Sequence, residues 1–306
     1  MAMQSSSLPP LDVQRAPEGG EVGAVQSGWR LALREFTNNR LAVLGFAILV
    51  FFVLFSFIGP LFYHTDQLTT SLTEANLPPS GQHPLGTDTA GFDELGRMMK
   101  GGQASLEIGF FAAFVAIVIG TLFGAVSGLI GGFVDSAMMR IVDIFLSVPF
   151  LFVVLILAVK FGATVLSLSL VIGFFAWQVP ARLVRGEVLS LRERDFVLAA
   201  RAAGASRWRL VSRHLIPNAL GVVIVNVTFQ VADAILAVSY VGFLGFGLHF
   251  PNVDWGDMLS DGITYLQDGY WWLIYPVGAC IVLTVMALNF IGDALRDAMD
   301  VRLRRR

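Results

Sequence analysis

The sequence predicts an all-α integral membrane protein with six transmembrane helices. Of its 306 residues, 55% are hydrophobic and only 14% are charged, whereas roughly a quarter of the residues in a soluble domain are charged. The mean hydropathy is +0.69. Six apolar runs reach or approach the roughly 20 residues that a helix needs to cross a bilayer core. Because lipid offers backbone groups no hydrogen-bond partners, runs of this length form helices.

These apolar runs cover most of the chain after residue 40. They comprise residues 41–63, 108–134, 144–159, 161–181, 218–248 and 269–292. The third run reaches spanning length only if its helix starts near Met138 and includes Asp143. Arg140 lies three residues before Asp143, so we expect an ion pair between them on one helix. The fifth run contains a single acid, Asp233.

Basic residues lie mainly in alternate connections between these runs. Four arginines precede residue 41 and eight lie between residues 182 and 213, whereas the opposite side holds only Arg97, Lys100 and Lys160. Loops with an excess of Lys and Arg stay on the cytoplasmic side. Both termini and the 182–217 connection are therefore predicted to be cytoplasmic.

This orientation divides the chain into five parts. They are an N-terminal cytoplasmic tail (1–40), the first transmembrane helix (41–63), an extracytoplasmic segment (64–104), a five-helix core (105–298) that includes the loop 182–217, and a basic cytoplasmic C-terminus (299–306). The tail is rich in Ser, Pro, Gly and acid, a composition that predicts disorder over most of its length.

The loop 182–217 is longer than a connection between helices requires. Small and apolar residues recur in it on one helical face, namely Phe196, Ala199, Ala200 and Ala203. Gly204 is suited to end that helix with a positive φ, and Ser206 is suited to cap a second one. Pro217 marks the boundary with the next membrane span. This helix, turn and helix either serves only as a basic topogenic or lipid-binding loop, or docks on a cytoplasmic protein.

A second small-residue pattern lies inside the second apolar run. Gly120, Gly124 and Gly128 form a doubled G-x-x-x-G, which lets the backbones of two membrane helices approach closely. We expect these glycines to serve helix packing.

The loop resembles the conserved cytoplasmic loop of binding-protein-dependent ABC importer permeases, which reads EAA, three residues, G, nine residues, I-x-L-P. The matching positions are Leu198, Ala199, Ala200, Gly204, His214, Ile216 and Pro217. Leu198 stands where that family usually has glutamate, and His214 where it has isoleucine.

Further segments are similar to the C-type subunit of dipeptide and oligopeptide permeases, over about residues 35–303. They are "HPLGTD" (83–88), "GGFVDSAMMRIVDIFLSVP" (131–149), "GFLGFGL" (242–248), "WGDMLSDG" (255–262) and "LTVMALNFIGDALRDAMD" (283–300). Phe92 stands where those subunits usually have arginine.

The resemblance implies a type I ABC importer permease that moves di- or oligopeptides across the bacterial cytoplasmic membrane. Such a chain pairs with a second permease subunit, rests on two ATPase subunits and receives substrate from an extracytoplasmic binding protein. Its loop acts as a coupling helix in a groove of the ATPase. The residues that would transmit the movement are Leu198, Ala199, Ala200, Arg201, Gly204, Ala205, Trp208, Arg209, Ile216 and Pro217.

The chain is not expected to be an enzyme. Its only lysines, Lys100 and Lys160, follow Met99 and Val159, so neither belongs to the G-K-[ST] of a phosphate loop. ATP and magnesium are therefore expected in the partner ATPase subunits. No catalytic cluster appears, and the scattered histidines have no metal-ligand spacing. We expect no metal site and no nucleic-acid partner.

Asp233 is the most informative residue inside the membrane, because an ionised side chain there costs roughly 2.5–3.5 kcal/mol. Asn226, Gln230 and Asp233 follow at i, i+4 and i+7 and form a polar stripe on the fifth span. The stripe either lines the translocation path, where the carboxylate could meet the amino terminus of a peptide, or bonds to neighbouring helices. Gln178, just before Pro180, is a weaker pathway candidate.

Two other functions remain open at this stage. Asp233 would suit a proton-coupled secondary transporter, although such folds usually contain internal repeats and the sequence has no clear one. An ABC permease of the same class would also fit a non-peptide substrate, such as a nickel chelate, an opine or glutathione.

Overall fold

The computed structural model describes residues 36–304. Nearly all of the predicted N-terminal tail, and the end of the predicted basic C-terminus, lie outside the described residues. Within them the chain is helical, and its only β pairing is an isolated bridge between Thr87 and Asp93. The all-α class predicted from the sequence is therefore confirmed.

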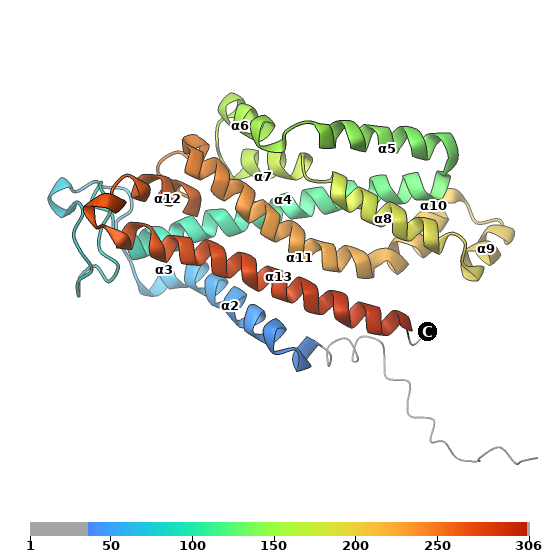
Figure 1. Cartoon of the computed structure of the whole chain (residues 1–306), viewed down its shortest axis with the longest axis horizontal. Coiled ribbons are helices and arrows are strands. Elements are labelled where there is room, and N and C mark those ends of the chain that lie inside the picture. The colour runs from blue at the N-terminus through green and yellow to red at the C-terminus, as the bar shows by residue number, and fades with distance from the viewer. Residues whose placement is uncertain (1–35, 305–306) are drawn as a thin grey trace, which may run out of the picture.

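The long helices lie side by side in an elongated bundle (Figure 1). They are α2 (Arg40–Phe57), α4 (Glu94–Ile130), α11 (Ile216–Val241) and α13 (Tyr275–Arg304). Along one side of α4 and α11 lie four shorter helices, α5 (Gly132–Ser147), α6 (Phe150–Phe161), α7 (Val165–Phe174) and α8 (Gln178–Leu191).

The two ends of the bundle differ in their short elements (Figure 1). One end carries α9 (Asp195–Ala202) and α10 (Arg207–Leu210), and α13 runs towards this end whereas α2 runs away from it. The opposite end carries α3 (Gly59–Phe62), α12 (Trp255–Ile263) and the 3₁₀ turns Leu72–Glu74, Leu266–Asp268 and Trp271–Leu273. Two π-helical stretches, Val211–Leu215 and Gly242–Phe246, flank α11.

Within residues 36–304, four helical stretches are long and apolar enough to cross a membrane, and two bent helix pairs raise the number to six if each pair is one span. The pairs are α5 with α6, bent by 77°, and α7 with α8, bent by 45°. The six predicted spans thus have counterparts, but the third and fourth are broken rather than continuous helices. Hydropathy does not register these breaks, because all four helices contribute to apolar runs.

Proline accounts for where both breaks occur. Val148 is extended (φ −84°, ψ 128°), as expected for a residue that precedes proline, and α6 begins directly after Pro149. Pro180 lies in the first turn of α8, where its missing N–H costs no helical hydrogen bond. The α8 helix then continues to Leu191, so it includes the first part of the predicted loop 182–217.

The second span is longer than its apolar run. Helix α4 begins at Glu94 rather than at Ile108, and the Asp93 side chain caps it by accepting a hydrogen bond from Gly96 N at 2.8 Å. Charged residues such as Arg97 and Lys100 lie on the same continuous helix. The predicted outer segment 64–104 therefore ends in helix.

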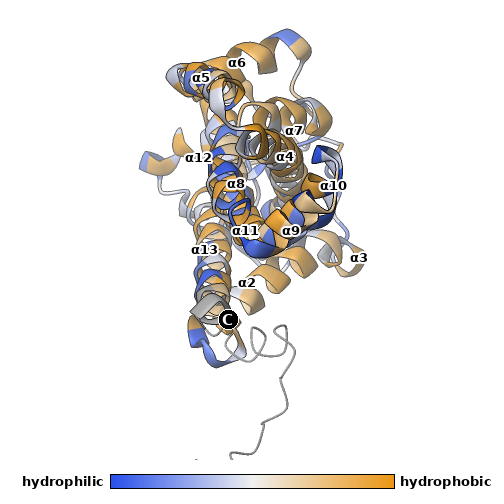
Figure 2. Cartoon of the chain, turned by 90° about the vertical axis from the view of Figure 1, so that its right-hand side faces the viewer, coloured by the Kyte–Doolittle hydropathy of each residue, from blue (hydrophilic) through white to orange (hydrophobic). Residues whose placement is uncertain are grey.

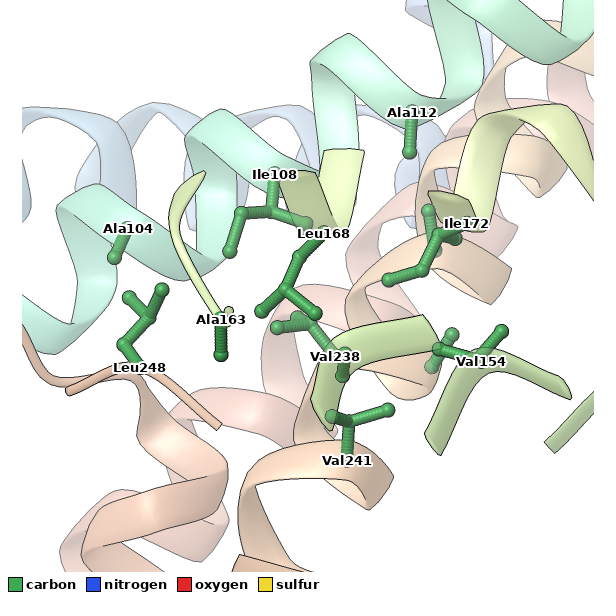
Figure 3. Packing of buried hydrophobic residues seen from close by; sticks show 13 residues of the cluster. Ala104, Ile108, Ala112, Val154, Ala163, Leu168, Ile172, Val238, Val241 and Leu248 are labelled. Carbon is green, nitrogen blue, oxygen red and sulfur yellow. The ribbon is translucent and has the colours of Figure 1, made fainter. Parts of the chain in front are cut away.

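Helix α4 forms the centre of the packing. Ala104, Ile108 and Ala112 of this helix meet side chains of α6, α7 and α11 in one buried cluster (Figure 3). At its other end, Gly120, Gly124 and Gly128 face α8. A Cβ at Gly120 would lie 2.7 Å from Trp177 O, one at Gly128 would lie 3.0 Å from Arg185 O, and one at Gly124 would meet Ala181 O. The two backbones are thus in direct contact, which any side chain would prevent.

Candidate translocation cavity and coupling surface

The loop motif forms a compact helix–turn–helix at one end of the bundle (Figures 1 and 2). Helix α9 ends before Gly204, whose φ of +81° is the positive value predicted for a helix stop. The Ser206 side chain then caps α10 by accepting a hydrogen bond from Arg209 N at 3.3 Å. Open space surrounds Gly204, because no atom lies within 4 Å of the position of a Cβ there. Its backbone conformation, rather than its surroundings, therefore calls for glycine.

Two buried side chains fix this element to the bundle. Val197 of α9 and Leu210 of α10 belong to a buried cluster with residues of α4, α8 and α11. Ile216, at the start of α11, is half-buried against the same cluster. A force on α9 would therefore reach α4, α8 and α11 through direct contacts.

The outer side of the helix–turn–helix is apolar and basic. Phe196, Leu198 and Trp208 are exposed by 42%, 43% and 67%. Among the other residues of the motif, Ala199, Arg201, Arg209 and Pro217 are exposed, whereas Ala200 and Ala205 are half-buried. No Asp or Glu occurs between residues 196 and 217. The surface thus suits a partner with an apolar floor and an acidic rim.

Two ion pairs, which the sequence patterns did not predict, join α5 to α8. Asp135 is buried and accepts hydrogen bonds from Ser127 Oγ and from both Nε and Nη2 of Arg185, the last at 2.6 Å. The more exposed Asp143 pairs with Arg182 of α8 at 2.5 Å, whereas Arg140 Nη1 is 3.9 Å away. The predicted pair between Arg140 and Asp143 is therefore present, but the shorter contact of Asp143 is with Arg182 on another helix.

A cavity of about 400 Å³ lies where the two bent pairs meet α11. Its wall combines the α5–α6 bend, the α7–α8 bend and one face of α11. Only three of its lining side chains are polar, namely Gln178, Gln230 and Asp233, and the rest are apolar. Three of the four predicted pathway residues, which come from two different helices, thus line one cavity.

These three polar side chains differ in burial. The side chains of Gln178 and Gln230 are 5% and 6% exposed. The side chain of Asp233 is exposed and lies on the face of α11 that lines the cavity. Asp233 makes no hydrogen bond or ion pair within the described part of the chain. An intramembrane carboxylate without a partner marks a functional site by default.

Asn226 lies outside this cavity. It lines a second cavity of about 370 Å³ between α8, α11 and α13, together with Glu187 and Arg296. Its Oδ1 atom is buried and lacks a hydrogen-bond partner. Along the axis of α11, Asn226 lies about 6 Å from Gln230. At that level α13, rather than the α5–α6 bend, forms the cavity wall opposite α11. Residues of α8 and α11 nevertheless line both cavities.

The opposite end of the molecule holds polar networks that sequence patterns did not predict. Asp93 accepts hydrogen bonds from Tyr63 Oη at 2.8 Å and lies 2.9 Å from His83 Nδ1. Phe92, the residue that departs from the usual arginine, is buried and stacks on Phe250. The segment before α4 is thus fixed to the loop before α12.

A carboxylate pair caps α12, outside the membrane-spanning helices. Asp254 is fully buried and accepts hydrogen bonds from Gly256 N at 2.8 Å and Asp257 N at 3.1 Å. Asp257 accepts one from Leu248 N at 3.0 Å. Burial, and next the adjacent Asp254 carboxylate, raises the pKa of Asp257 to about 9. The Asp257 carboxyl is therefore protonated at neutral pH.

Comparison with known proteins agrees with this geometry. The family described as the binding-protein-dependent transport system inner membrane component matches residues 120–305, which contain both the helix–turn–helix and the cavity. The chain belongs to this family. The N-terminal TM domain of oligopeptide transport permease C matches residues 27–79.

The family assignment extends to close relatives of similar length. The dipeptide transport system permease protein DppC of Bacillus subtilis is 39% identical over 274 residues, which cover 90% of this chain and 86% of that protein. The oligopeptide transport system permease protein OppC of Escherichia coli is 42% identical over 278 residues, 90% of this chain and 91% of that protein. The chain is thus a bacterial-type ABC permease subunit, a multi-pass transporter component and not an enzyme.

A solved structure shows the same fold. An inward-facing conformation of the MetNI methionine ABC transporter aligns with a TM-score of 0.52 and 25% identity, covering 67% of this chain and 96% of that chain. This similarity confirms the predicted ABC importer permease architecture.

Proposed function

We propose that this subunit carries di- or oligopeptides into the cell as part of an ATP-driven importer. The names of its dipeptide and oligopeptide relatives support this substrate class over a nickel chelate, and family membership supports an ABC importer over a proton-coupled transporter. The observation that carries the proposal is the cavity lined by Gln178, Gln230 and Asp233, which lies between helices that lead directly to α9.

The complex contains a second permease subunit, two ATPase subunits and an extracytoplasmic binding protein. ATP and magnesium bind to the ATPase subunits. Both termini and α9 face the cytoplasm, while α12 and the segment before α4 face outward. The arginine-rich loop 182–217 supports this orientation, as do the directions of α2, which runs away from the end that carries α9, and of α13, which runs towards it.

Helices α9 and α10 form the coupling element and dock in a groove of the ATPase subunit. The exposed side chains of Phe196, Leu198 and Trp208 provide an apolar contact, and the small side chains of Ala199 and Ala203 allow close approach. Buried Val197 and Leu210 pass the movement to the bundle. Helix α8 then moves the wall of the cavity, because Gln178 is at its far end.

The proposed transport is tested by reconstituting the whole complex in lipid vesicles with a labelled tripeptide. We expect uptake that requires ATP, magnesium and the binding protein, and that persists when a proton ionophore removes any pH gradient. Uptake driven by a pH gradient without ATP would favour the secondary transporter, and uptake of a nickel chelate but no peptide would reject the peptide substrate.

A further inference from the structure

The cavity lined by Gln178, Gln230 and Asp233 contains a negative charge and no positive charge. Its lining contains one carboxylate, Asp233, two amides and otherwise apolar side chains, with no Lys, Arg or His. Such a cavity attracts a cationic group and disfavours an anionic one, because no positive charge faces the carboxylate. The occupant that fits best carries a single positive charge next to an apolar part.

The two glutamines add hydrogen-bond acceptors to the same wall. Gln178 and Gln230 line the cavity and are otherwise almost completely buried. The side-chain oxygen of each can accept a hydrogen bond. A primary ammonium group has three N–H donors. Asp233 with the two amide oxygens offers acceptors for all three donors, and the carboxylate contact is charge-assisted.

We propose that Asp233 binds the α-ammonium group of the peptide in transit, so that the permease itself favours substrates with a free amino terminus. This inference rests on the proposed function and assigns the substrate end that enters the cavity. The apolar lining, which includes Phe145, Phe150 and Phe175, accommodates the first side chains of the peptide. Anionic chelates are disfavoured in the same cavity.

The test compares two peptides that differ only in charge at the amino terminus, Ala-Ala-Ala and N-acetyl-Ala-Ala-Ala. The complete reconstituted complex transports each at a saturating concentration, with wild-type permease and with Asp233→Asn. Because the same binding protein serves both variants, a change in the preference between peptides arises in the permease. We expect Asp233→Asn to lower uptake of the free peptide about tenfold or more and to leave the acetylated peptide unchanged.

Two further variants serve as controls. Asp233→Glu keeps the carboxylate and should retain the preference for the free amino terminus. Asp268→Asn removes an acidic side chain at the outer end, outside the lining of the cavity, and should leave the preference as in the wild type. Co-purification of all subunits shows that each variant assembles.

Other outcomes would overturn the inference. An equal loss for both peptides would indicate that Asp233 pairs with a basic residue of another subunit, and loss of subunits on purification would support the same conclusion. Unchanged uptake of both peptides would leave Asp233 without a role in recognition. In each of these cases ATP-dependent uptake by the wild type still stands, so failure of this inference is distinct from failure of the proposed function.

Discussion

Asp254 and Asp257 form a closely packed pair of carboxyl side chains outside the membrane-spanning helices. A Cβ at Gly242 or Gly247 would overlap their carboxylate oxygens, so the chain contacts the pair from both sides. The raised pKa of Asp257 means that folding favours its protonated form. The pair therefore stabilises the outer end most at low pH, and this contribution decreases as the pH rises from about 4 towards the folded pKa of about 9.

Replacing the acid with its neutral analogue tests this dependence. Asp257→Asn keeps an acceptor for Leu248 N and supplies a permanent donor towards Asp254. We expect the variant to unfold at a higher temperature than the wild type at pH 8, and the difference to shrink towards pH 5. Thermal unfolding of the purified complex measures both. A difference that grows as the pH falls would contradict the protonated state assigned to Asp257.

Gly204 allows a second test of a single residue. Gly204→Val introduces a β-branched side chain at a φ of +81°, at a cost of about 1–2 kcal/mol, and should disrupt the turn between α9 and α10. We expect membrane insertion to remain and peptide-stimulated ATP hydrolysis to fall several-fold.

The matched control for Gly204 is Gly269→Val. Gly269 has a φ of +86° and equally open surroundings, but it directly follows the 3₁₀ turn Leu266–Asp268, far along the chain from α9 and α10. The same local strain there should leave ATP hydrolysis coupled to peptide. Normal coupling in Gly204→Val would remove the helix–turn–helix from the mechanism.

At the level of elements, α8 joins the proposed coupling element, α9 and α10, to the cavity. Its first residue, Gln178, lines the cavity, and its last turn leads into α9. The glycines of α4 hold one side of α8, and the Asp135–Arg185 and Asp143–Arg182 pairs attach α5 to another. Helices α5 and α8 are therefore expected to move together, and both contribute to the cavity wall.

Loss of the buried ion pair should be more harmful than loss of the exposed one. Arg185→Ala leaves the buried Asp135 with a single hydrogen-bond donor, which costs about 1–3 kcal/mol. Arg182→Ala breaks a half-exposed pair and should cost at most about 1 kcal/mol. The two variants are compared by measuring their unfolding temperatures and their uptake rates. Equal effects would indicate that the Asp135 pair does not hold α5 on α8.

The sequence predicts the elements better than their bends and cross-links. Runs of apolar residues locate the spans, and the i, i+4, i+7 spacing locates the polar stripe that contains Asp233. Hydropathy misses the breaks at Pro149 and before Pro180, although the proline rule could have found both. The Asp135–Arg185 pair joins positions 50 residues apart, so no local spacing reveals it. Asn226 has the spacing of the polar stripe but lines the cavity next to α13. Its position depends on how α8, α11 and α13 pack, which no local spacing reveals.

For the whole molecule, the cavity lined by Gln178, Gln230 and Asp233 lies between two ends of opposite character. The helix–turn–helix at one end is basic and apolar, whereas the end that carries α12 contains buried carboxylates such as Asp93 and Asp254. The cavity lies on the helix that leads to the coupling element. We therefore expect nucleotide at the ATPase subunits to change access to the cavity lined by Gln178, Gln230 and Asp233; this is the central claim.

Site-directed thiol labelling tests this claim most directly, because Cys280 is the only cysteine and is buried. In a Cys280→Ser background, Val179→Cys places a thiol at an exposed position in the cavity lining, and Asp297→Cys places one at an exposed position near the end of α13, after the apolar run 269–292 and outside that lining. Both variants are exposed to a membrane-impermeant thiol reagent added from the cytoplasmic side of the reconstituted complex. We expect labelling of Val179→Cys to fall when a non-hydrolysable ATP analogue binds, and labelling of Asp297→Cys to stay constant. Labelling of Val179→Cys that is unaffected by nucleotide would contradict the account.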